Sequence, residues 1–184
     1  MCRRVCSFVS VLITLAALGS APASQGSNSR ATAAFAEGIP ETAFGGFRSA
    51  AVVVMVNRVR RIDAMDAAPD PGADFYAQIT IDGVENTSAA IESRNDVAPQ
   101  WTFTRDVSAP TASIIIKLFD KDAAGTDDHC DINPLARKRD IHITYDLIAG
   151  RITGDAGGVR QKLIHVVGSG DDKRAEIWFT VFHR

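Results

Sequence analysis

The segment from Ile114 to Asp131 constrains the fold of this chain more than any other part of the sequence. Its first part, Ile114 to Phe119, is mostly β-branched or aliphatic, which is typical of a buried β-strand. A short loop then carries five aspartates, namely Asp120, Asp122, Asp127, Asp128 and Asp131. Two unit charges about 5 Å apart repel by roughly 3 kcal/mol at an effective dielectric near 20, so such a loop favours a bound cation. The segment predicts a strand that leads into a cation site, and the alternative is a solvated acidic turn.

The first 23 residues have the organisation of a secretory signal peptide. Arg3 and Arg4 precede an apolar run from Val5 to Leu18, and Ala21-Pro22-Ala23 matches an A-x-A cleavage site. The apolar run is shorter than the roughly 20 residues that a membrane-spanning helix needs. We therefore expect cleavage near Ala23 and export to the extracellular space or the periplasm.

Residues 24–49 are rich in Ser, Ala and Gly and are expected to form a flexible leader, followed by one domain over residues 50–184. Loss of the signal peptide leaves 18 Lys and Arg against 22 Asp and Glu, a net charge of −4 that argues against nucleic acid as a partner. Cys130 is then the one remaining cysteine. An internal disulfide is therefore excluded, and the fold depends on its core or on a bound ion.

Within the domain, short apolar runs alternate with turn residues such as Asp82-Gly83. The predicted strands are Ala50–Ile62, Phe75–Ile81, Val84–Ile91, Gln100–Val107, Ile114–Phe119, Ile141–Tyr145, Val159–Val167 and Ala175–Phe182. No run has the length and period of a helix, and no apolar run in the domain is long enough to cross a membrane. This succession predicts an all-β fold, an eight-stranded antiparallel β-sandwich.

A second acidic loop lies between the first two predicted strands. It contains Asp63, Asp66, Asp70 and Asp74. Loops that are distant in sequence gather at one end of an antiparallel sandwich, so we expect Asp66 and Asp74 to face Asp120, Asp122 and Asp128 across a shared ion. A set of carboxylate oxygens on flexible loops favours Ca²⁺ over Mg²⁺.

Three motifs in this order resemble the C2 domain family of calcium- and phospholipid-binding sandwiches. The first is an aspartate loop leading into a strand, here Asp66 followed by Asp74-Phe75-Tyr76. The second is Pro99-Gln100-Trp101 before a strand, and the third is Asp120, Asp122 and the Asp127-Asp128 pair. The resemblance covers roughly residues 50–182.

The resemblance implies five calcium ligands: Asp66, Asp74, Asp120, Asp122 and Asp128. It also implies calcium-dependent binding to an anionic phospholipid surface or to a protein partner, and a circularly permuted (type II) strand order with the extra strand at the C-terminus. The sequence departs from the family pattern at Phe75, at Ala98 and at Cys130-Asp131. The last departure adds Asp131, which is expected either to join the site or to face water.

Other interpretations of the same residues are weaker. An EF-hand would need an oxygen ligand where Ala124 stands and a helix where the β-branched run lies. An ion-free structural or adhesive sandwich remains the alternative function. Catalysis is not expected, because His129, His142, His165 and His183 show no ligand or triad spacing. We interpret Trp101 and Trp178 as core residues rather than a carbohydrate-binding surface.

Overall fold

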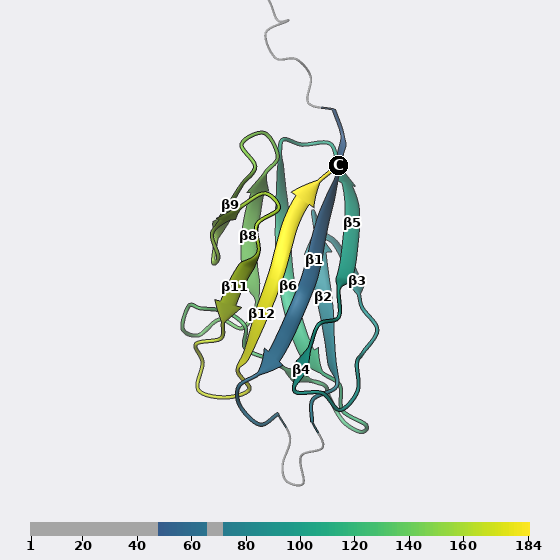
Figure 1. Ribbon diagram of the computed structural model, residues 1–184, viewed down its shortest axis with the longest axis vertical. Coiled ribbons are helices and arrows are strands. Elements are labelled where there is room, and N and C mark those ends of the chain that lie inside the picture. The colour runs from purple at the N-terminus through teal and green to yellow at the C-terminus, as the bar shows by residue number, and fades with distance from the viewer. Residues whose placement is uncertain (1–47, 66–71) are drawn as a thin grey trace, which may run out of the picture. The chain divides into compact units, whose positions relative to one another are not determined.

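The computed structural model describes residues 48–65 and 72–184 (Figure 1). Within these ranges the chain forms twelve strands and no helix. The strands are β1 (Ala50–Arg61), β2 (Phe75–Ile81), β3 (Val84–Thr87), β4 (Asp96–Val97), β5 (Trp101–Val107), β6 (Thr111–Asp120), β7 (Asp128–His129), β8 (Ile141–Asp146), β9 (Arg151–Gly154), β10 (Gly158–Val159), β11 (Ile164–Val167) and β12 (Ala175–His183). The predicted all-β fold is confirmed. The described ranges include no apolar helix of the length that a membrane crossing requires.

The strands form two antiparallel sheets, as predicted for a sandwich (Figure 1). One sheet has the order β11-β12-β1, with β4 and β5 both pairing with β1. The other has the order β10-β9-β8-β6-β2-β3, with β7 pairing with β6. β4, β7 and β10 have two residues each, so the longer strands account for most of both sheets.

The last strand lies beside the first, which agrees with the predicted permuted order. β12 runs antiparallel to β1 from Val52, opposite His183, to Arg61, opposite Ala175. Next to the Val52–His183 end of this pair, Ala51 and Arg184 exchange two backbone hydrogen bonds of 3.3 and 3.0 Å. The C-terminal strand is therefore an integral part of the sheet.

Two predicted strands are shorter in the structure by several residues. β3 ends at Thr87 because Ser88 turns back to Ala77: its backbone N–H donates to Ala77 O, and its Oγ accepts from Ala77 N. β11 begins at Ile164 because a turn precedes it, in which Lys162 N donates to Val159 O. Irregular hydrogen bonds to Ala77 of β2 at the first place, and a turn at the second, thus replace the regular ladder.

The core lies between the sheets and is built from alternate side chains of the long strands. Val52, Val54 and Val56 of β1 are fully buried, as are the residues of β2 and β6 that face them: Ala77, Ile79, Ile114, Ile116 and Leu118. β2 and β6 pair in register from Phe75 opposite Asp120 to Ile81 opposite Ile114. The start of β2 therefore lies beside the end of β6, and the two acidic loops meet there.

Candidate cation-binding site

The two acidic loops are joined by two hydrogen bonds of Asp74. The backbone N–H of Asp74 donates to Asp120 Oδ1 at 2.5 Å, and Lys121 N donates to Asp74 O at 3.1 Å. Asp74 directly precedes β2 and Asp120 is the last residue of β6, so the sheet register fixes this meeting. The predicted approach of the two loops is present in the fold.

One cavity of about 320 Å³ opens between these loops. It is lined by Gly72, Asp74, Ser93, Asp120, Lys121, Asp122, Ala123 and Ala124. Asp120 is 2% exposed, whereas Asp74 and Asp122 are half-buried. Three of the five predicted ligands, Asp74, Asp120 and Asp122, therefore share a single cavity.

A third segment, around Ser93, orients Asp74. The backbone N–H of Ser93 donates to Asp74 Oδ1 at 2.6 Å. Gly72 permits this close approach, because a Cβ at Gly72 would lie 2.9 Å from the backbone carbon of Ser93, and its φ of 106° disfavours any other residue. The carboxylate of Asp74 is thus fixed toward the cavity wall by backbone contacts.

Asp127 and Asp128 bind different partners. Tyr76 donates its hydroxyl hydrogen to Asp127 Oδ2 at 2.7 Å, and Asp122 N donates to Asp127 Oδ1 at 3.2 Å. Burial, together with the bond to Asp127, raises the pKa of Tyr76 to about 12. Asp128 forms an ion pair with Lys173. Asp127 therefore stabilises the loop through its bonds to Asp122 and Tyr76. Asp128 is neutralised by a lysine of the same chain.

Asp131 neither lines the cavity nor faces water, so both expectations for it were wrong. It is 1% exposed and accepts hydrogen bonds from the backbone N–H groups of Asn133 and Gly170. Its carboxylate anchors the segment after β7 to the connection between β11 and β12. The extra acid of this loop has a structural role.

Asp63, another acidic residue of the first loop, is paired with an arginine. Arg174 donates from Nε and Nη2 to the two oxygens of Asp63, at 2.9 Å each, which lowers the pKa of Asp63. Asp66 and Asp70 lie outside the described residues. The predicted role of Asp66 as a ligand stays a prediction.

Cys130 lies directly beneath this site. Its side chain is fully buried, and Sγ lies 3.9 Å from Asp128 O and 4.0 Å from Met65 Sδ. Burial raises the pKa of the thiol. Such a thiol is chemically inert while the fold is closed.

The donor set of the cavity suits a hard cation, because carboxylate oxygens are the ligands that Ca²⁺ prefers. Among the described side chains, however, no three His, Cys, Asp or Glu converge closely enough to hold a metal ion. Asp128 is turned to Lys173 and Asp127 to Tyr76. Ion binding at Asp74, Asp120 and Asp122 would therefore require these carboxylates to move closer together.

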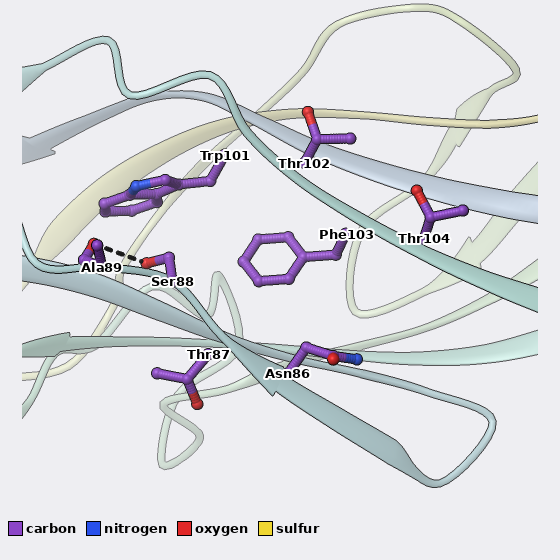
Figure 2. A pocket seen from close by; sticks show the side chains of 8 residues that line it. All are labelled: Asn86, Thr87, Ser88, Ala89, Trp101, Thr102, Phe103 and Thr104. Atoms are coloured by element: carbon purple, nitrogen blue, oxygen red, sulfur yellow. Dashed lines mark hydrogen bonds between the residues drawn. The ribbon is translucent and has the colours of Figure 1, made fainter.

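A second hollow of about 310 Å³ lies between β3 and β5 and has a different chemistry (Figure 2). Trp101 and Phe103 project into it from β5, and the side chains around them are neutral: Asn86, Thr87, Ser88, Ala89, Thr102 and Thr104. Trp101 packs partly against the core, as expected. Trp178 instead lies half-buried on the outer face of its sheet, stacked on His165 with ring centroids 4.3 Å apart.

Sequence reasoning missed two residues of the acidic site. Ser93 gave no signal, because it contributes a backbone N–H that any residue supplies. Lys173 belongs to the polar connection between the last two strands, where a lysine is ordinarily solvated. Its approach to Asp128 depends on the backbone hydrogen bond from Asp131 N to Lys173 O and on the bridge between Asp131 and Arg174, which only the three-dimensional structure shows.

The fold is similar to two solved structures. The C2A domain of plant extended synaptotagmin 1 matches with a TM-score of 0.50 at 13% sequence identity, over 73% of this chain and 94% of that chain. A calcium-bound structure of the C2A and C2B domains of extended synaptotagmin 2 matches with a TM-score of 0.51 at 12% identity, over 73% of this chain and 45% of that chain. No protein-family model and no curated protein matches the sequence. The chain has the fold of a C2 domain, and the resemblance drawn from its three motifs is confirmed at the level of the fold.

Proposed function

We propose that this protein is a calcium-binding module of the C2 type. Asp74 from the first loop and Asp120 and Asp122 from the second hold the ion, with Asp66 as a further ligand. The observation that carries this proposal is the single cavity that the three described carboxylates line. The calcium-bound state of one structural neighbour supports it.

The residues around the cavity prepare it for an ion in two ways. Backbone N–H groups orient the carboxylates of Asp74 and Asp120, so little order has to be gained on binding. The concentration of negative charge raises the attraction for a cation, and water completes the six to eight oxygens that calcium takes. The bound ion supplies positive charge at this end of the sandwich.

The partner that we propose is an anionic phospholipid surface, with a protein as the alternative. A bound cation reverses the local charge and attracts acidic headgroups. Ala123 and Ala124 at the cavity rim are small, so the attachment is electrostatic rather than by insertion of bulky apolar side chains. Binding to vesicles that contain phosphatidylserine should therefore need calcium and weaken as salt is added.

Thermal unfolding with calcium and with a chelator tests the ion site. Extracellular calcium modules bind with Kd of about 10⁻⁴ to 10⁻³ M. Free calcium about tenfold above Kd stabilises the folded state by about 1.4 kcal/mol, a rise of several degrees in Tm. The substitution Asp122→Asn should abolish most of this rise, because it removes one carboxylate from the cavity.

Asp106→Asn is the matched control, because Asp106 is an exposed residue of β5 and does not line the cavity. It removes one negative charge and should leave the calcium-dependent rise unchanged. Equal Tm values for the wild-type protein in calcium and in chelator would contradict the proposal.

The second candidate function is an ion-free structural or adhesive sandwich. The ion pair between Lys173 and Asp128 favours it, since a lysine already binds one of the predicted ligands. In that case Asp122→Ala should change neither stability in calcium nor partner binding.

A further inference from the structure

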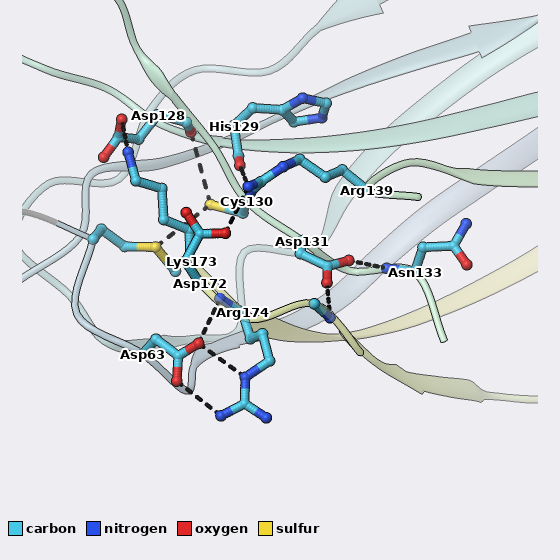
Figure 3. Close-up of polar contacts among 12 residues, drawn as sticks. Asp63, Asp128, His129, Cys130, Asp131, Asn133, Arg139, Asp172, Lys173 and Arg174 are labelled. Carbon is cyan, nitrogen blue, oxygen red and sulfur yellow. Dashed lines mark hydrogen bonds and ion pairs between the residues drawn. The ribbon is translucent and has the colours of Figure 1, made fainter. Parts of the chain in front are cut away.

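A lysine ammonium group is bound to a carboxylate that the sequence places among the calcium ligands. Lys173 pairs with Asp128 Oδ1, and the two side chains are 31% and 19% exposed (Figure 3). Asp128 lies directly opposite Asp120, one of the cavity carboxylates, across the β6–β7 pair. The lysine therefore places a positive charge beside the proposed ion site.

The backbone holds Lys173 in this position. Its carbonyl oxygen accepts a 2.8 Å hydrogen bond from Asp131 N. Its φ of 52° lies in the left-handed region, a backbone conformation that is unfavourable for residues other than glycine. The next residue, Arg174, is fixed by three hydrogen bonds to Asp63. A surface lysine on a free loop would have none of these restraints.

The whole connection between β11 and β12 is attached to the segment that follows β7. Gly170 N donates to Asp131 Oδ2, and Ser169 N donates to Asn133 O at 3.0 Å. Arg139 bonds both His129 O and Asp172 Oδ1, at 2.7 Å each. Lys173 and Asp128 thus belong to two segments that are joined on several sides (Figure 3).

We propose that Lys173 is a tethered cation that competes with calcium for Asp128 and thereby sets the calcium affinity of the site. This inference rests on the proposed function. Asp128 ligates an ion only when the ammonium group leaves it, so each binding event includes the loss of one ion pair. No covalent step is involved.

Calcium titration by isothermal calorimetry of the purified protein tests the proposal, with calcium chloride as the only ligand. Lys173→Met removes the charge and keeps the apolar stem. It should raise calcium affinity about two- to fivefold, the size expected for an ion pair that solvent partly screens. Lys173→Arg keeps the charge and should retain the wild-type affinity.

Lys162→Met is the matched control, because Lys162 is exposed and lies in the turn before β11. It should leave the affinity unchanged. Lys173→Gln is the second variant if methionine impairs folding, which far-ultraviolet circular dichroism detects.

A double-mutant cycle with Asp128→Asn locates the effect. In the wild-type background this substitution should change calcium affinity little, because the loss of a ligand is offset by an ion pair that no longer has to be broken. In the Lys173→Met background it should remove the whole gain, a non-additivity that is expected only for coupled residues. Additive effects of the two substitutions would overturn the proposal.

Thermal stability provides a second readout. In chelator, Lys173→Met should lower Tm, since the Asp128 carboxylate loses its partner. In saturating calcium this difference should largely disappear, because the wild-type protein has then lost the ion pair as well.

The outcomes separate this proposal from the proposed function. Equal calcium affinity of the wild-type protein and the methionine variant overturns the role of Lys173 and leaves calcium binding intact. Binding by the variant alone supports the role of Lys173 and shows that the wild-type protein is ion-free. Binding by neither overturns both.

Discussion

At the scale of single residues, the aspartates of the acidic segment have different roles because each meets a different partner. Asp120 accepts from the backbone of the other loop, Asp127 from Tyr76, and Asp128 from Lys173. Asp131 is buried and binds backbone N–H groups. Spacing along the chain gives no information about these partners. The sequence therefore predicted an acidic loop but not which group each aspartate binds.

The Asp63–Arg174 pair leads to a prediction about acid stability. Arg174 lowers the pKa of Asp63 in the folded state, so the folded protein binds fewer protons at this site than the unfolded chain does. The resulting stabilisation is fully present above the unfolded pKa of about 3.9 and is lost as the pH falls through the folded pKa. Asp63→Asn should therefore lower Tm by a few degrees at pH 7 and have almost no effect in strong acid.

Thermal melts of the wild-type protein and Asp63→Asn across this pH range check the expectation. A difference in Tm that stays constant from neutral to acid pH would show that the carboxylate charge is not responsible.

At the scale of elements, β6 determines where the site lies. It pairs with β2 on one side and with β8 and β7 on the other, and it ends at Asp120. Its alternate residues Ile114, Ile116 and Leu118 are fully buried, whereas Ile115 and Phe119 are half-buried on the opposite face. Packing of one face therefore fixes the register that brings Asp120 to the start of β2.

Truncation of a buried residue of β6 should test this dependence. Ile116→Ala should lower the free energy of unfolding by about 2–5 kcal/mol, the usual range for such a cavity. Ile115→Ala is the matched control and should cost clearly less, because Ile115 faces outward. Urea unfolding measures both values, and similar losses would contradict the assigned strand face.

The long strands could be predicted from the sequence because their apolar pattern and their core contacts agree. The predicted bounds of β2 match the structure, and those of β1 and β12 differ by one residue. The shorter β3 and β11 could not be predicted, since the Ser88 bonds to Ala77 and the turn at Lys162 depend on local geometry. The same limit applies to the site: the meeting of the loops follows from strand order, whereas the position of Lys173 does not.

At the scale of the whole molecule, we propose that the protein is exported. The first 23 residues have the signal-peptide pattern, and millimolar calcium outside the cell would suit a weak site. Protein collected from the secreted or periplasmic fraction should begin at Ser24, which intact-mass measurement detects. Retention of residues 1–23 in that fraction would contradict this cleavage.

The buried thiol beneath the acidic site has a practical consequence. A thiol-specific label can reach Cys130 only while the surrounding structure is transiently open, so the rate of labelling reports the population of open molecules. Any ligand that joins the two acidic loops should slow this reaction by lowering that population. The protein thus contains its own reporter of loop opening, at a position that needs no engineered cysteine.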